Sequence, residues 1–327
     1  MTRIAVLDDW QDMARDLADW SPLEGRGEVV FFRGALAGVD DAAAKLADFD
    51  IILTMRERSA FPASLAARLP RLRMLGITGL RAAAIDVAAL QARGVVVCHT
   101  ASVPGSPPPM TGLAATAELT LGLMIAAIRR IAEGDAAIRT GRFQEDVAQG
   151  YALAGRTLGL IGLGRIGGMM ARYAAALGMD VIAWSENLTD ARAQEAGALR
   201  VAKHDLLARA DVVSLHLVLS DRTRGIIGAA DLARMKPGAV LLNTSRGPLV
   251  DEAALLAALQ SGHILAGLDV FDREPLPAGH PLRTAPNCVL TPHVGYVVRE
   301  VMADFYRQSI ANALAFLDGS PVRVIAG

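Results

Sequence analysis

Residues 157–178 read TLGLIGLGRIGGMMARYAAALG, and this stretch decides the fold. The apolar run Thr157–Ile161 is typical of a buried strand, and Ile166–Leu177 has the composition of a helix. Between them stand three glycines at the spacing G-x-G-x-x-G, namely Gly162, Gly164 and Gly167. The first permits a tight turn, the second lets the backbone approach a pyrophosphate, and the third allows close packing of helix on strand. A chance match is the alternative in a chain with 31 glycines, but the strand–turn–helix context favours a dinucleotide site.

The preference for NAD or NADP depends on the residue at the end of the second strand, about 20 residues after the glycines. The segment VIAWSENL places Ser185 and Glu186 at that tip. A carboxylate there accepts hydrogen bonds from ribose hydroxyls and repels a 2′-phosphate, and the nearest downstream arginine is Arg192. We therefore expect NAD as the cofactor, with NADP still open and a solvent-facing Glu186 as the alternative.

Short apolar runs alternate with Ala/Leu-rich segments along the rest of the chain, which is typical of α/β proteins with parallel sheets. We expect two doubly wound parallel-sheet domains with a cleft between them. The first, flavodoxin-like and discontinuous, takes residues 1–100 and 297–327. The second, a Rossmann domain, takes residues 101–296 and binds NAD. The strands expected in the first are Arg3–Leu7, Val29–Phe32, Ile51–Thr54, Arg73–Ile77 and Val95–Cys98. Those expected in the second are Thr157–Ile161, Val181–Trp184, Val212–Leu215, Ala239–Asn243, Leu265–Asp269 and Val289–Thr291.

A break separates the two predicted domains. Residues 99–112, HTASVPGSPPPMTG, contain four prolines and two glycines and cannot form regular structure. The Pro-rich stretch 103–111 is a candidate either to cover the cofactor or to hold a partner subunit. One long helix is then expected over 114–140, apolar on nearly every face. Because such a helix must be buried, we expect it to pack partly against a second copy in a homodimer.

Composition excludes several classes of function. The 327 residues carry a formal charge of −1, so nothing in the charge balance favours a nucleic-acid or membrane partner. Only three of 33 basic residues are lysines, which leaves few candidates for Schiff-base chemistry. Two cysteines cannot make a disulfide framework or a thiolate metal site, and no metal is expected. The N-terminus has no apolar leader and no apolar run is long enough to span a bilayer, so a cytoplasmic protein is expected.

Three segments after the glycine turn each follow a predicted strand and bring charged side chains to its carboxyl end. They are LLNTSRGPLVD with Arg246, AGLDVFDREPLP with Asp269 and Glu274, and LTPHVGY with His293. Open α/β sheets bind ligands at this edge, so we expect these side chains near the dinucleotide.

Taken together, these segments resemble the D-2-hydroxyacid dehydrogenase family, which includes glyoxylate/hydroxypyruvate reductases and phosphoglycerate dehydrogenases. The stretches that carry the resemblance stand in the family's order and spacing: GLIGLGRIG, DVVSLHLVLSDRTRGIIG, MKPGAVLLNTSRGPLVDEAAL, AGLDVFDREPL and TPHVG. The resemblance implies hydride transfer between a nicotinamide and C2 of a small 2-hydroxy or 2-oxo acid.

The resemblance also implies roles for three residues. Arg246 is expected to bind the substrate carboxylate and carbonyl through its fork of donors. His293 is expected to be the proton donor, because imidazole titrates near the operating pH. Glu274 is expected to hold the other ring N–H of His293. A structural ion pair, a surface histidine and a loop carboxylate are the corresponding alternatives.

Further cofactor contacts are implied at the matching strand ends. Asp269 resembles the position beside the nicotinamide, with a strand-end cap as its alternative, and His216 resembles a position near the cofactor rather than a proton donor. The cofactor set we expect is Gly162, Gly164, Arg165, Ile166, Gly167, Ser185, Glu186, His216, Thr244, Ser245, Asp269, Gly295 and Thr116.

The resemblance implies that the first domain is the substrate/catalytic domain, although its substrate loop departs from the family pattern. The segment GITGLRAAAID makes Thr78 and Gly79 the matching positions for the substrate carboxylate, while Arg81 either adds charge there or faces water. Arg56 or Arg58, after the third strand, is a candidate partner for a second anionic group, and a solvated loop is the alternative. The expected substrate contacts are thus Thr78, Gly79, Arg58, Arg246 and His293.

Two other functions remain as alternatives. One is a dinucleotide-sensing binding protein or corepressor of the same fold, since a fold does not settle function. The other is formate or phosphite oxidation. Glu274 stands where formate enzymes have Gln, which disfavours formate more than phosphite.

Overall fold

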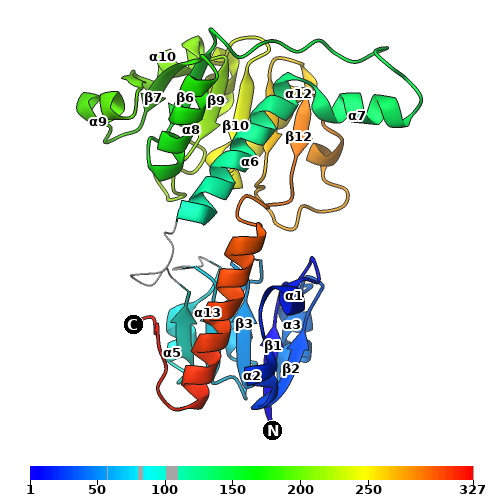
Figure 1. Ribbon diagram of the computed structural model, residues 1–327, viewed down its shortest axis with the longest axis vertical. Helices are drawn as coiled ribbons and strands as arrows, with labels where there is room; N and C mark the ends of the chain where they lie inside the picture. Colours follow the sequence, from blue (N-terminus) through cyan, green and yellow to red (C-terminus); the bar gives the residue numbers. More distant parts are fainter. Residues whose placement is uncertain (57, 80–83, 101–109, 327) are drawn as a thin grey trace. The chain divides into compact units, whose positions relative to one another are not determined.

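The protein is described by a computed structural model (Figure 1), which covers residues 1–56, 58–79, 84–100 and 110–326. Arg81 and residues 103–109 of the Pro-rich stretch lie outside the described residues. The chain divides into two compact units. Unit 1 comprises Met1–Pro109 and Val298–Gly327, and unit 2 comprises Met110–Val297.

Unit 1 is built on a five-stranded parallel sheet in the order β2-β1-β3-β4-β5. Every residue of β3 and β4 is buried, as expected for central strands that helices cover on both faces. The strands are β1 Thr2–Val6, β2 Gly27–Phe31, β3 Ile51–Thr54, β4 Met74–Ile77 and β5 Val96–His99.

The helices of unit 1 include one from the far end of the chain. They are α1 Ala14–Leu17, α2 Ser21–Glu24, α3 Val39–Leu46, α4 Ala63–Ala66, α5 Val87–Gln91 and α13 Arg299–Leu317. The last, α13, packs against β4, α1 and α2 (Figure 1). On the sheet face of α3, α4 and α5, side chains such as Leu46, Leu65, Leu75 and Leu90 form an apolar core.

Unit 2 is built on a seven-stranded parallel sheet in the order β12-β11-β10-β9-β6-β7-β8. The strand order reverses between β6 and β9, so the turn after β6 lies at the topological switch point where such sheets bind ligands. The strands are β6 Thr157–Ile161, β7 Asp180–Trp184, β8 Leu199–Arg200, β9 Val212–Leu215, β10 Val240–Asn243, β11 Leu265–Leu268 and β12 Cys288–Leu290. The short β8 was not predicted.

Helices cover the sheet of unit 2 and enclose two apolar cores. They are α6 Met110–Ile128, α7 Ile131–Arg139, α8 Arg165–Ala176, α9 Asp190–Glu195, α10 Lys203–Arg209, α11 Ala229–Arg234 and α12 Glu252–Gln260, with the 3-10 turns η1 Gly247–Leu249 and η2 Pro281–Thr284. Both this parallel-sheet unit and unit 1 fit the two-domain α/β fold expected from the sequence.

The prediction of one continuous helix over 114–140 is wrong. The chain leaves helical geometry at Arg130, whose φ of 54° is left-handed, and α6 and α7 meet there at an angle of 63°. The Arg130 guanidinium donates to the side chains of Glu133 and Asn287, at 2.9 and 3.0 Å. These bonds offset the cost of a left-handed arginine.

Unit 2 buries part of the apolar surface of α6. This helix packs against α8, β10 and β11 (Figure 1), and Leu123, Met124 and Ile128 are buried in the core. Among the described residues no single helix is long and apolar enough to cross a membrane, and α6 with α7 passes that test only as a bent pair. Burial within unit 2 accounts for part of this apolar composition. Leu119 and Leu121 are only half-buried, so the predicted packing of α6 against a second copy stays a prediction.

Candidate active site

The glycine turn lies between β6 and α8. Gly162 has a left-handed φ of 101°, and a Cβ there would lie 2.5 Å from the His216 carbonyl oxygen. A Cβ on Gly167 would overlap the Gly162 carbonyl, whereas one on Gly164 would meet no atom of the described residues within 4 Å. Within the same described part of the chain, no side chain caps the start of α8 at Gly164. The turn therefore fits a pyrophosphate, with open space at the second glycine and helix N–H groups at the site.

The end of β7 stands next to this turn, because the Gly162 N–H donates to the Trp184 carbonyl at 2.8 Å. Ser185 follows and is half-buried, and Glu186 is exposed. The position suits a carboxylate that accepts hydrogen bonds from the ribose of a bound dinucleotide.

His216 lies directly beneath the glycine turn, at the end of β9. Its Nε2 is 2.9 Å from the Ser214 hydroxyl, and its Nδ1 is buried without a hydrogen-bond partner among the described residues. Burial lowers the pKa of His216 to about 4, so the ring is neutral at physiological pH. A neutral ring in this place suits a packing role beside the cofactor rather than proton donation.

Arg246 is carried by a turn that follows β10, and the neighbouring side chains hold its backbone. The Asn243 amide donates to the Arg246 carbonyl at 2.8 Å, and the Ser245 hydroxyl donates to the Leu215 carbonyl at 2.7 Å. The Arg246 guanidinium donates to the Ser245 carbonyl at 2.7 Å. These bonds fix the direction in which the guanidinium leaves the sheet edge.

His293 stands in a strained turn after β12, with a left-handed φ of 54°. Asp269, buried at the end of β11, holds this turn from below. Its Oδ1 accepts from the Thr291 hydroxyl at 2.6 Å and the Val294 N–H at 2.8 Å, and its Oδ2 accepts from the Gly295 N–H at 2.9 Å. Burial raises the pKa of Asp269, and these hydrogen bonds oppose that rise.

Glu274 joins His293 in the arrangement expected for an acid–base pair. The Glu274 Oε2 lies 2.5 Å from Nδ1 of His293, and its Oε1 accepts from the Phe271 N–H at 2.9 Å. The two side chains are 31% and 26% exposed, so the pair is partly shielded from water. The ring of Tyr296 meets the His293 ring edge-on at 5.9 Å.

Hydroxyl groups from α6 complete this edge of unit 2. Thr116 donates towards the carbonyls of Gly112 and Gly295, at 3.0 and 3.1 Å. Thr120, fully buried, bonds to the Thr244 hydroxyl at 2.7 Å. Sequence reasoning missed Thr120, although its position one helical turn after Thr116 is a usable signal.

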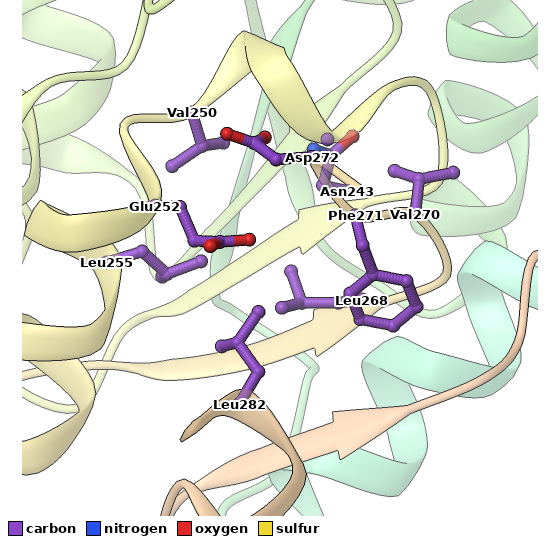
Figure 2. Close-up of a pocket in the computed structure, with 10 residues that line it drawn as sticks. Asn243, Val250, Glu252, Leu255, Leu268, Val270, Phe271, Asp272 and Leu282 are labelled. Atoms are coloured by element: carbon purple, nitrogen blue, oxygen red, sulfur yellow. The ribbon is translucent and has the colours of Figure 1, made fainter. Parts of the chain in front are cut away.

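The segments that carry Arg246 and Glu274 touch each other. A Cβ on Gly247 would overlap the Phe271 carbonyl group, so only glycine allows this approach. Behind the contact lies a small cavity lined by residues of both segments, including Glu252, Asp272 and Leu282 (Figure 2).

In unit 1, the predicted substrate residues lie at the carboxyl ends of the strands. Gly79, with φ 91°, donates its N–H to the Thr100 hydroxyl at 2.8 Å, and Thr78 accepts from the Arg56 N–H. The Arg56 guanidinium lies against the Cα of Gly79. Arg58 instead donates to the Asp8 carbonyl at 2.8 Å and stacks over the Trp10 ring. Of the two arginines, Arg56 is thus the one beside the predicted carboxylate loop.

Unit 2 therefore brings a glycine turn, an arginine and a histidine–carboxylate pair to the carboxyl ends of one parallel sheet. Among the described residues no group of three or more His, Cys, Asp or Glu side chains is placed to hold a metal ion. Such an arrangement can bind a dinucleotide, hold an anion and move a proton.

Residues 121–295 match the family described as D-isomer specific 2-hydroxyacid dehydrogenase, NAD binding domain. The chain belongs to the D-isomer specific 2-hydroxyacid dehydrogenase family. A hydroxypyruvate reductase from Blautia hydrogenotrophica is 31% identical over 99% of both chains. A D-3-phosphoglycerate dehydrogenase from Mycobacterium leprae is 39% identical over 74% of this chain, which spans only 44% of that relative.

A solved structure supports the same conclusion for the fold. The phosphoglycerate oxidoreductase from Vibrio cholerae has 34% identity and a TM-score of 0.89, over 98% of this chain and all of that one. This member of the 2-hydroxyacid dehydrogenases is accordingly an NAD(P)-dependent oxidoreductase with NAD as the expected cofactor. The relatives are named as enzymes, which does not favour a binding protein or corepressor.

Proposed function

We propose that the enzyme interconverts a small 2-oxo acid and its 2-hydroxy acid, with His293 as the acid–base and Arg246 as the carboxylate anchor. The observation that carries this proposal is the 2.5 Å contact of His293 with Glu274, on a turn held by Asp269. NADH, when bound, supplies the hydride that the carbonyl carbon takes up.

Proton transfer follows from the hydrogen bonds of the pair. An ionised carboxylate only accepts hydrogen bonds, so Glu274 selects the form of His293 with a proton on Nδ1. The other ring nitrogen, Nε2, then gives its proton to the substrate oxygen as the carbon–oxygen π bond opens, and takes it back in the oxidation. Glu274 stabilises the imidazolium form, as the carboxylate does in other acid–base pairs.

Arg246 has the chemistry to bind the acid. Its planar fork of N–H donors pairs with a carboxylate in bidentate geometry. The bonds around Asn243 and Ser245 fix the turn in advance, which lowers the entropic cost of binding.

In unit 1, we propose that Thr78 and Gly79 bind the substrate carboxylate through backbone groups and that an arginine adds charge. The contact with Gly79 supports Arg56 for this role. Arg58 was predicted from the sequence as a substrate contact. Its hydrogen bond to the Asp8 carbonyl favours a structural role instead, in holding the turn at Asp8. Small acids of two or three carbons, such as glyoxylate and hydroxypyruvate, are the substrates we propose.

The test is oxidation of NADH and of NADPH by glyoxylate, hydroxypyruvate, pyruvate, phenylpyruvate and 2-oxoglutarate. We expect turnover with NADH and a preference for the smallest acids, with NADPH used less well because of Glu186. Tight NADH binding without turnover of any acid would support the dinucleotide-sensing alternative instead.

We also propose a homodimer in the cytoplasm. Ile131 and Ile138 on α7 and Phe143 after it are 52%, 57% and 69% exposed, an unusual concentration of large apolar side chains. A second copy of the chain is the occupant we propose for this surface. The free cysteines Cys98 and Cys288 fit a reducing compartment.

A further inference from the structure

Two segments of unit 2 carry the proposed catalytic groups, and each continues into a polar side chain that meets the other. The first runs from Arg246 through η1 to Glu252, the first residue of α12. The second runs from Asp269 through Glu274 to His280, which caps η2. Nε2 of His280 lies 3.0 Å from Oε1 of Glu252. We propose that Glu252 and His280 are positioning residues, whose hydrogen bond holds Glu274 and Arg246 in register. This inference rests on the proposed function.

The hydrogen-bond partners of His280 assign one ring nitrogen as acceptor and the other as donor. Its Nδ1 accepts from the Leu282 N–H at 3.3 Å, so the ring proton sits on Nε2 and is donated to Glu252. The two side chains are 18% and 23% exposed, so water competes weakly for this bond. Leu282 itself is buried, which fixes the cap and hence the ring.

The charges around Asp272 add to the case for this bond. Asp272 on the second segment faces Glu252 and Asp251 on the first, with Arg224 and His280 as the opposing positive or donating groups. Burial, followed by the charge of Glu252, raises the pKa of Asp272. Three carboxylates on two touching segments repel each other, and the His280 N–H is a donor placed between the segments to offset that repulsion.

Apolar packing alone does not lock the segments together. They touch at Gly247 and Phe271, but next to this contact is a cavity of about 10 Å3, enough for one water molecule at most. Figure 2 shows Glu252 and Asp272 at one side of the cavity and the apolar side chains of Phe271, Leu268 and Leu282 at the other. Beside this space the Glu252–His280 bond is a polar tie between the two segments, so its loss would weaken the support of the segment that carries Glu274.

The test compares variants that break the bond with variants that keep it. Glu252→Ala and His280→Asn both remove the bond, and the Asn side chain can still accept from the Leu282 N–H. Glu252→Gln keeps an acceptor for this bond, and His280→Gln keeps a donor. We expect kcat to fall about tenfold or more in the first pair, since small misplacements cost up to about 100-fold. The KM for NADH stays within about twofold, and the Gln variants recover most of kcat.

The matched control is His204→Asn. His204 forms an exposed pair with Asp205 on α10, at 3.2 Å, and its loss should change neither kcat nor KM. A second readout does not depend on turnover: two-bond 1H–15N spectra of ring-labelled histidine, with the His293 signal assigned by His293→Asn. We expect the Nδ1 and Nε2 shifts of His293 to become more alike in Glu252→Ala, as its bond to Glu274 weakens.

Two results would overturn the inference. One is wild-type kcat in both Glu252→Ala and His280→Asn. The other is an unchanged His293 ring spectrum in these variants together with a lower melting temperature, which would show a purely structural role. Absence of turnover by the wild-type enzyme would instead contradict the proposed function, and the ring spectra would still decide the positioning claim.

Discussion

His293 shows how a single residue is prepared for chemistry at some cost to the fold. A left-handed backbone is unfavourable for a histidine, by roughly 1–3 kcal/mol for such strained conformations. Asp269 offsets this cost with hydrogen bonds to Thr291, Val294 and Gly295. The sequence predicted that Asp269 contacts the cofactor, which stays a prediction. In the structure both carboxylate oxygens of Asp269 accept hydrogen bonds from the turn that carries His293.

Asp269→Asn tests this function of the buried carboxylate. One oxygen becomes an NH2 group, which cannot accept from the backbone N–H that it faces. We expect a loss of about 1–3 kcal/mol in the free energy of unfolding and a fall in kcat of about tenfold or more. Urea unfolding and steady-state kinetics measure the two effects, and wild-type values of both would show that the turn holds itself.

Asp8, in unit 1, gives a pH dependence with a definite sign. This side chain is buried, and burial raises its pKa from 3.8 to about 6, against the Ser59 hydrogen bond and the charge of Arg58. Between these two pH values the folded protein keeps a proton that the unfolded chain has released. The free energy of unfolding therefore falls as pH rises through this window, by up to about 3 kcal/mol.

Asp8→Asn removes the titrating group and keeps a side chain that tolerates the left-handed φ of 62°. Relative to the wild type, the variant should gain stability as pH rises from 4 to 7. Urea unfolding at pH 4.5 and pH 8 measures this difference. A constant difference across that range would mean that Asp8 does not titrate there.

At the scale of elements, the sequence predicted a structural feature correctly where residues close together in the chain determine it. The strand–glycine turn–helix unit at 157–178 was predicted with the bounds of β6 unchanged. The break between α6 and α7 at Arg130 was not predicted, because neither glycine nor proline marks it. The Arg130 side chain also bonds to Asn287, which lies far along the chain. The two-residue β8 is too short for any periodic signal. Likewise, the Thr120–Thr244 bond joins residues 124 positions apart.

The contact between the segments that carry Arg246 and Glu274 can be tested by adding one methyl group. Gly247→Ala places a methyl group against the Phe271 carbonyl, so one segment must shift. We expect kcat to fall by about 100-fold with little change in NADH affinity, because the glycine turn is untouched. The control is Gly228→Ala, because a Cβ there meets no atom within 4 Å in the part of the chain that the structure describes. Equal kinetics in both variants would contradict the importance of the contact.

At the scale of the whole molecule, both units follow the same rule, with candidate binding groups at the carboxyl ends of parallel strands. The fold class was predicted from alternating apolar runs, since that pattern is repeated in every strand and helix. The long helix was also predicted to need a second subunit to bury it. In the structure α6 is buried only in part by its own unit, because Leu119, Leu121 and Ile125 are half-buried. The packing of α6 against a second copy therefore stays a prediction, and the exposed side chains of α7 add a second candidate surface for a dimer.

The dimer prediction has a direct test. The double variant Ile138→Asp, Phe143→Asp places two charges on the exposed apolar surface. Because a dimer through this surface would have to bury these charges, we expect the variant to be a monomer in sedimentation velocity. A variant with the sedimentation coefficient of the wild type would show that this surface is not the interface. The exposed Val218→Asp serves as the control.

The most direct measurement for the whole account is the kinetics of His293→Asn with NADH and the best 2-oxo acid. If His293 delivers the proton, kcat falls by about 100-fold to 10,000-fold while the dissociation constant of NADH, from fluorescence, changes less than about twofold. A variant that keeps more than about one third of the wild-type kcat would contradict the account, because another group would then have to protonate the substrate.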